Sequence, residues 1–195
     1  DGAGIMVQIP HEFILLKGIP VPEKGKYGTG LVFLPKDKTE QDKILKVMIE
    51  VIEAEGLNLM KLRDVPTNPA CLGKVALESE PDIKQVFITG VSNEDAPNLE
   101  RKLYVIRKKI ENQVNHKDFY IVSLSSKNII YKGMLSSMQV RDYFDDLRDT
   151  YFTSGLALVH SRFSTNTFPT WSLAQPFRLL CHNGEINTVR GNRNW

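Results

Sequence analysis

The order of apolar and polar positions predicts a series of short strands in the first half of the chain. Three stretches, 4–9, 30–34 and 85–89, are mainly apolar and are flanked by Gly or Pro. Stretches of this length and composition are typical of strands. Residues 57–63 alternate apolar and polar side chains, which also indicates a strand. Together with the helix described next, these stretches predict the order β-β-α-β-β.

Residues 39–55 have apolar side chains at helical spacing. The positions that share one face are Ile44, Val47, Met48, Val51 and Ile52. Thr39 is suited to the N-cap and Gly56 to the C′ position. The segment is therefore predicted to be an amphipathic helix.

A second long helix is predicted from Asn98, which is suited to an N-cap. Its apolar positions recur at spacings of four, three, four and four, at Leu99, Leu103, Ile106, Ile110 and Val114. This spacing places them on one face of a helix, with the Arg and Lys residues of the segment facing solvent.

Two further elements are predicted before the last forty residues. Residues 119–124 and 129–131 are short apolar runs, and we expect them to form a hairpin through 125–128. Ser136 or Ser137 is expected to cap a third, shorter helix. Since no repeat, low-complexity stretch or long linker divides the sequence, residues 1–195 are predicted to form a single α+β domain.

Composition and charge exclude several classes of protein. The 195 residues include 25 Lys and Arg against 23 Asp and Glu, a formal net charge of +2, which excludes a charge-driven nucleic-acid or membrane binder. No apolar run approaches the roughly 20 residues of a membrane helix, and residues 1–4 have no signal-peptide character. A cytoplasmic location is therefore expected, or a plastid if the source is a photosynthetic eukaryote. The two cysteines, Cys71 and Cys181, support neither a disulfide framework nor a metal site.

Candidate chemistry begins near residue 155. Residues 155–159 (GLALV) predict a buried strand that delivers His160 and the polar residues after it, a common arrangement at an active site. Arg162 can donate paired hydrogen bonds to a carboxylate, and the side chains of residues 164–166 could orient a small polar substrate. The alternative is that Arg162 forms a structural ion pair.

A second predicted strand, 177–181, leads into Asn183 and Gly184. Asn-Gly is a strong signal for a tight turn, so a simple hairpin explains the pair. However, an amide side chain beside a Gly backbone N–H can also direct two donors at one oxygen, as an oxyanion hole requires.

The remaining nucleophilic and basic candidates are weaker. His160 and His182 each flank an apolar strand and lack partners at metal-ligand spacing, so we expect packed, hydrogen-bonded histidines. Cys181 is expected in the core, with no neighbour that lowers its thiol pKa, and Cys71 has no recognisable base. The residues thus predict a carboxylate clamp and an oxyanion hole for acyl transfer without a nucleophile.

Motifs in the same region resemble a known family. They are residues 160–171 (HSRFSTNTFPTW), 175–178 (QPFR) and 181–188 (CHNGEINT). Together with residues 1–5 (DGAGI) and 123–127 (SLSSK), they resemble the glutaminase domain of glutamate synthase over essentially the whole chain.

This resemblance implies a class II glutamine amidotransferase of the N-terminal-nucleophile hydrolase type, an α+β fold with a four-layer αββα sandwich. In that family the nucleophile is an amino-terminal cysteine whose own α-amine serves as the base. The first residue here is Asp1. The resemblance therefore implies a partial domain, incomplete at both ends, in which the catalytic cysteine precedes Asp1.

The resemblance also implies roles for individual residues. Arg162 would bind the α-carboxylate of L-glutamine, and Phe163 and Thr165 would complete the substrate pocket. Asn183 and Gly184 would form the oxyanion hole. No metal site is implied.

Cofactors and partners follow from the resemblance as well. No cofactor is expected in this chain, whereas FMN and an iron–sulfur cluster are implied for the downstream part of the intact enzyme. There the released ammonia would reach 2-oxoglutarate, with electrons from ferredoxin, NADPH or NADH. The expected partners are L-glutamine, synthase domains of the same polypeptide, and a small subunit or ferredoxin.

Two other classes of function remain open from the sequence alone. The chain could be a non-catalytic, amidotransferase-like domain that senses glutamine. It could also be a regulatory or structural segment that packs against a synthase domain. A cysteine some tens of residues upstream of Asp1 in the native product would favour the enzyme.

Overall fold

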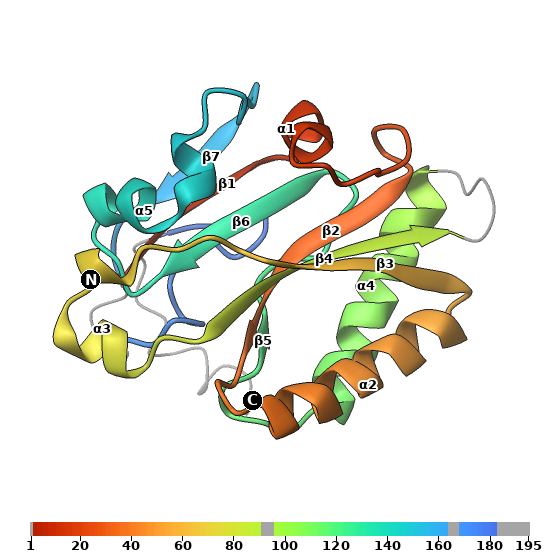
Figure 1. Ribbon diagram of the computed structural model, residues 1–195, viewed down its shortest axis with the longest axis horizontal. Coiled ribbons are helices and arrows are strands. Elements are labelled where there is room, and N and C mark those ends of the chain that lie inside the picture. Colours follow the sequence, from red (N-terminus) through yellow and green to blue (C-terminus); the bar gives the residue numbers. More distant parts are fainter. Residues whose placement is uncertain (1, 91–95, 164–167, 183–195) are drawn as a thin grey trace, which may run out of the picture.

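The computed structural model describes residues 2–90, 96–163 and 168–182. Within these ranges the strands form two antiparallel sheets, ordered β6-β1-β7 and β3-β4-β2-β5 (Figure 1). The strands are β1 (Ala3–Gln8), β2 (Tyr27–Leu34), β3 (Leu57–Asp64), β4 (Asp82–Gly90), β5 (Tyr120–Ile121), β6 (Asn128–Gly133) and β7 (Ala157–His160). The α-helices are α1 (His11–Leu16), α2 (Lys38–Ala54), α3 (Lys74–Glu78), α4 (Ala96–Gln113) and α5 (Ser137–Tyr143), with 3-10 turns at Pro69–Cys71 and Asp145–Arg148.

The two sheets pack face to face between helical layers. In β2, Leu31 and Phe33 belong to the core shared with the β6-β1-β7 sheet, whereas Val32 and Leu34 belong to the core beneath α2 and α4. This alternation follows from the two-residue period of a strand whose two faces are both buried. Figure 1 shows α2 and α4 together on one side of the molecule and α5 on the other. The predicted α+β class and αββα layering are confirmed.

The β6-β1-β7 sheet also buries both of its faces near β6. Tyr131 of β6 turns toward α5 and the turn after it, where its ring lies 5.1 Å from that of Phe144. Its neighbour Lys132 has its side chain on the opposite, inter-sheet face, because successive side chains alternate along a strand. A lysine is therefore buried between the two sheets.

The predicted helix at 39–55 is α2, with a different N-cap. Asp37 caps it, since its carboxylate accepts a 3.0 Å hydrogen bond from the Glu40 amide. The prediction of Thr39 as N-cap is wrong, because a carboxylate two residues earlier accepts this bond and favours the positive end of the helix dipole. Gly56 has φ +73°, the left-handed conformation of a C′ residue, as predicted.

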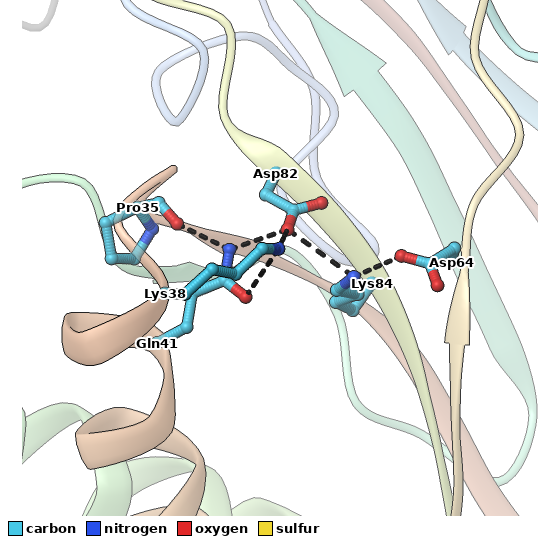
Figure 2. A network of polar contacts seen from close by, with 6 residues as sticks. All are labelled: Pro35, Lys38, Gln41, Asp64, Asp82 and Lys84. Atoms are coloured by element: carbon cyan, nitrogen blue, oxygen red, sulfur yellow. Dashed lines mark hydrogen bonds and ion pairs between the residues drawn. The ribbon is translucent and has the colours of Figure 1, made fainter.

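A polar network fixes the start of α2 to the start of β4. Figure 2 shows the Asp82 carboxylate receiving hydrogen bonds from Gln41 Nε2 at 2.6 Å and from Lys38 Nζ at 3.0 Å. Gln41 also donates to the Pro35 carbonyl oxygen at 2.7 Å. Burial raises the pKa of Asp82, but these donors and the charge of Lys84 outweigh burial, so the pKa lies below its usual value.

The second predicted helix is α4, and it begins before the expected cap. Asn98 lies in its first turn, so the prediction of Asn98 as N-cap is wrong. The helix thus starts two residues before the expected cap. The predicted apolar face is confirmed, with Leu99, Leu103 and Ile106 buried against the sheet.

The predicted hairpin at 119–131 is wrong. β5 pairs with β2 in one sheet, and β6 pairs with β1 in the other. The connection crosses between the sheets and is held by Glu100 of α4, whose carboxylate accepts hydrogen bonds from Ser125 Oγ at 2.8 Å and from the Ser126 amide at 2.7 Å. Residues 122–127 thus connect a strand of one sheet to a strand of the other, where a hairpin would connect two neighbouring strands of one sheet.

The third predicted helix is α5, capped by Ser136. Its hydroxyl accepts from the Gln139 amide at 3.4 Å, and the Gln139 side chain accepts from the Ser136 amide at 2.9 Å. α5 ends at Tyr143 and a 3-10 turn follows. Two short helices, α1 and α3, were not predicted, and none of the helices in the described ranges is long and apolar enough to cross a membrane.

Candidate functional site

The first candidate segment leaves the sheet at the end of β7. β7 pairs antiparallel with β1, and Gly4 lies opposite His160. β7 is the last strand of its sheet in the described residues, and Val159 is 65% exposed. The predicted strand is confirmed, but the prediction that it is buried is wrong, because only one strand covers its edge.

Arg162 and Phe163 follow β7 directly. The Arg162 side chain is exposed, and no ion pair of this residue is found among the described residues. Phe163 is half-buried, and its ring packs against Gly2, beside the first strand. The described residues thus leave the Arg162 side chain exposed, whereas the Phe163 ring is packed against Gly2.

The second candidate segment is a turn and not a strand. The amide and carbonyl of Phe177 bond to those of Leu180 at 2.8 and 2.9 Å, and Arg178 has φ 52°. Leu179 and Leu180 are exposed. The predicted strand at 177–181 is thus wrong, since five mainly apolar residues form a projecting turn here.

The two candidate segments lie side by side. Cys181 Sγ is 3.8 Å from the Val159 carbonyl oxygen of β7. Burial lowers the pKa of His160, a hydrogen bond with the Arg162 main chain opposes this, and the charges of His182 and Arg162 lower it further. Residues 159–162 and 181–182 therefore converge at one edge of the β6-β1-β7 sheet.

The two histidines match the prediction of packed rings in part. His182 is half-buried and its main chain is hydrogen-bonded. The His160 ring is bonded to the Arg162 main chain, but its buried Nε2 has no partner among the described residues.

Neither cysteine is placed as a nucleophile. Cys181 is half-exposed, so its predicted place in the core is wrong. Cys71 is also half-exposed; its Sγ lies 3.2 Å from the Asn68 carbonyl oxygen, and burial raises the pKa of its thiol. A raised thiol pKa favours the protonated, weakly nucleophilic form.

Thr165, Asn183 and Gly184 lie outside the described residues. The described chain ends its last segment at His182, the residue that precedes Asn183. The structure thus brings together the end of β7, which precedes Arg162, and residues 181–182, which precede Asn183.

Two buried polar residues beneath this edge were not singled out from the sequence. Gln175 is 2% exposed, and its side-chain amide forms hydrogen bonds with the main chain of His182. Lys132 is fully buried; its Nζ donates to the Ser172 carbonyl oxygen at 2.8 Å and lies 4.3 Å from the centre of the Phe177 ring. The predicted strand ended at Tyr131, whereas β6 continues to Gly133, so Lys132 shares a face of the strand with Ile130.

A cavity of about 650 Å³ lies on the other face of this sheet, between β1, β7 and α5. Its lining is mainly apolar and includes Ile5, Val140 and Phe152, with His160 and Ser161 among the polar residues. Arg141 is the charged residue of the lining.

The described residues include few side chains that could bind a metal ion or an iron–sulfur cluster. In the described ranges no group of three or more His, Cys, Asp or Glu side chains is placed to hold a metal ion. An iron–sulfur cluster takes four thiolates, and the chain has only Cys71 and Cys181. The residues of this chain therefore do not fit an iron–sulfur cluster.

The fold and the converging segments define an α+β protein with two stacked antiparallel sheets and a polar site at a sheet edge. The class-II glutamine amidotransferases match the chain over residues 1–195. The chain therefore belongs to this family of enzymes.

Curated relatives are similar to the chain along its whole length. The NADPH glutamate synthase large chain of Bacillus subtilis is 52% identical over 201 residues, covering 100% of this chain and 13% of the relative. The NADH glutamate synthase of Saccharomyces cerevisiae is 43% identical over 210 residues, covering 100% of this chain and 10% of the relative. The chloroplastic ferredoxin-dependent glutamate synthase of Spinacia oleracea is 41% identical over 203 residues, covering 100% and 12%. The chain thus spans between 10% and 13% of the length of these relatives.

Proposed function

We propose that residues 1–195 are part of the glutaminase domain of a glutamate synthase, which hydrolyses L-glutamine to glutamate and ammonia. One observation carries this proposal: the end of β7 and residues 181–182 meet at one sheet edge, with Cys181 Sγ 3.8 Å from the Val159 carbonyl oxygen. His160 and residues 181–182 begin two of the motifs that resemble the family, 160–171 and 181–188. The full-length protein is a polypeptide that carries this chain together with the amino-terminal cysteine and the synthase domains of the family.

Substrate binding is assigned to the segment after β7. The exposed Arg162 guanidinium grips the α-carboxylate of glutamine with paired hydrogen bonds, which suits its planar fork. Phe163, packed on Gly2, and Thr165 complete the pocket. A ring held by the fold gives the substrate a fixed wall.

The reaction uses a nucleophile supplied by the full-length protein. Its cysteine thiolate attacks the side-chain amide carbon of glutamine, and Asn183 and Gly184 donate hydrogen bonds to the oxyanion that forms. The α-amine of the cysteine, which took the thiol proton, gives it to the leaving nitrogen, so that collapse breaks the carbon–nitrogen bond, releases ammonia and leaves a glutamyl thioester. Water then hydrolyses the thioester, which gives glutamate and restores the thiol.

The wider reaction lies outside this chain. Ammonia passes to 2-oxoglutarate in synthase domains of the same polypeptide, where FMN and an iron–sulfur cluster carry electrons from ferredoxin, NADPH or NADH. The names of the three relatives include each of these donors, so similarity supports none of them over the others. A cytoplasmic site, or a plastid in a photosynthetic eukaryote, fits this role.

Ammonia release from L-glutamine tests the proposal. The full-length protein is expected to release ammonia, and replacement of its amino-terminal cysteine by Ala is expected to abolish the release. The 195-residue chain alone is expected to release none, with or without Cys181→Ser. Release by the chain alone that Cys181→Ser abolishes would contradict the proposal, and binding of glutamine without hydrolysis by the full-length protein would favour a sensing domain.

A further inference from the structure

We propose that Gln175 is a positioning residue, which holds the main chain of His182 and thereby orients the donors of the oxyanion hole that follow it. The proposal rests on the function proposed above for Asn183 and Gly184. It assigns a task to a buried amide that takes no part in binding or chemistry itself.

The side-chain amide of Gln175 forms two hydrogen bonds with the main chain of one residue, His182. Its Nε2 donates to the His182 carbonyl oxygen at 2.9 Å, and its Oε1 accepts from the His182 amide at 2.8 Å. This is the bonding pattern that a neighbouring strand would provide, supplied by one side chain. Since a peptide group is planar, the bond to the His182 carbonyl restrains rotation of the peptide group that leads into Asn183.

Gln175 is buried and packed closely against β1. Its side chain is 2% exposed, and its carbonyl oxygen lies over Gly4 of β1, where an added Cβ would be only 2.6 Å away. Close packing of this kind leaves the buried amide little freedom to move. The two hydrogen bonds therefore connect His182 through Gln175 to β1 of the sheet.

The residues just before Gln175 are anchored as well. Lys132 Nζ donates to the Ser172 carbonyl oxygen at 2.8 Å, and the Trp171 indole donates to the Ala76 carbonyl oxygen at 3.1 Å. By contrast, the turn between Gln175 and His182 projects outward, with Leu179 73% exposed. An exposed turn provides little restraint. The two hydrogen bonds from Gln175 therefore fix the position of the His182 main chain.

The test is a kinetic comparison in the full-length protein. Gln175→Leu keeps the side-chain volume and removes both hydrogen bonds. It is expected to lower kcat for glutamine hydrolysis by about 10- to 100-fold, the scale of a displacement of about 1 Å in a catalytic group, with KM changed less than about 3-fold. Activity with free ammonia should be retained, which shows that the synthase domains are intact, and the nearly unchanged KM for glutamine shows that the domain carrying Gln175 is folded.

Gln41→Leu is the matched control. Gln41 is also a buried amide that bonds a main-chain carbonyl, at Pro35, but it lies at the start of α2 (Figure 2). Its kcat for glutamine should equal that of the unaltered protein. Should Gln175→Leu fail to fold, Gln175→Glu is the second variant. It keeps an acceptor for the His182 amide and replaces the donor by a carboxylate oxygen, which repels the His182 carbonyl oxygen, so a loss of kcat is again expected.

A double variant separates positioning from general stability. If Gln175 acts through Asn183, then Gln175→Leu adds little to the loss caused by Asn183→Ala, because the donor it positions is already gone. Fully multiplicative losses, or an unchanged kcat in Gln175→Leu, would overturn this inference while Asn183→Ala still lowers kcat. An unchanged kcat in Asn183→Ala would instead overturn the proposed function, whatever the result at Gln175.

Discussion

At the scale of single residues, Arg162 is the side chain whose chemistry is easiest to isolate. Lys in its place keeps the positive charge and loses the planar pair of donors that fits a carboxylate. Arg162→Lys in the full-length protein is therefore expected to raise KM for glutamine about 10-fold or more, with a smaller change in kcat.

Arg148→Lys provides the control for this measurement, because Arg148 forms a surface ion pair with Asp145. Its KM should not change. Steady-state kinetics that show an unchanged KM in Arg162→Lys would return Arg162 to the role of a structural residue.

Lys132 makes a prediction about stability and pH. Burial lowers its pKa to about 7 from the usual 10.5, and its neighbour Tyr120 has a pKa raised to about 12 by burial, so Tyr120 stays neutral. Between pH 7 and 9 the unfolded chain holds the lysine proton and the folded chain releases it, so stability rises with pH. The free energy of unfolding is expected to rise by about 2 kcal/mol over this interval relative to Lys132→Met.

Chemical denaturation at pH 7, 8 and 9 measures this difference. Lys132→Met removes the group that titrates and keeps a long apolar side chain, so its stability should be flatter with pH. Parallel pH curves for the two proteins would show that Lys132 keeps its charge when buried, held by the Ser172 carbonyl oxygen and the Phe177 ring.

At the scale of elements, the cap of α5 can be tested directly. The sequence allowed Ser136 or Ser137 as the N-cap, and the structure assigns Ser136, which forms a reciprocal pair of hydrogen bonds with Gln139. Ser136→Ala is expected to lower the free energy of unfolding by about 1 kcal/mol. Ser137→Ala, one position into the helix, should change it by less than about 0.5 kcal/mol; equal losses in denaturant titrations would contradict the assignment.

Helices with a long apolar face were the elements that the sequence predicted best. The spacing of five apolar residues in α2 and of Leu99, Leu103 and Ile106 in α4 sets one face of each helix, and burial follows that face. Their caps were predicted less well, since Asp37 competes with Thr39, which is equally suited by type, and α4 starts two residues before Asn98.

Strand pairing could not be predicted in the same way. The apolar runs at β5 and β6 are both strands, but local alternation does not state which sheet a strand joins, and Glu100 from a distant helix holds the crossing. The run at 177–181 failed for a related reason. Five mainly apolar residues fit a strand or an exposed turn equally, and only long-range contacts decide between them.

At the scale of the whole molecule, the proposed site lies at the edge of a sheet. α2 and α4 cover one face of the β3-β4-β2-β5 sheet (Figure 1). β7 is the last strand of the other sheet in the described residues, and the motifs at 160–171 and 181–188 begin beside it. The sequence indicated Arg162 and Asn183 by residue type and resemblance. Gln175 belongs to the motif at 175–178, but the sequence could not indicate its task, because its partner His182 is seven residues away and only the folded turn brings the two close.

The kinetic role of Asn183 tests the account most directly, because an oxyanion donor meets full negative charge only in the tetrahedral intermediate, and a turn residue meets none. In the full-length protein, Asn183→Ala is expected to lower kcat for glutamine hydrolysis by about 10²- to 10³-fold, roughly 3 to 4 kcal/mol, with a smaller change in KM and with ammonia-dependent activity retained. Asn183→Gly, which keeps the freedom of a turn and removes the amide, should show the same loss. Near-normal glutamine turnover in Asn183→Gly would show that Asn183 serves only the turn and would contradict the account.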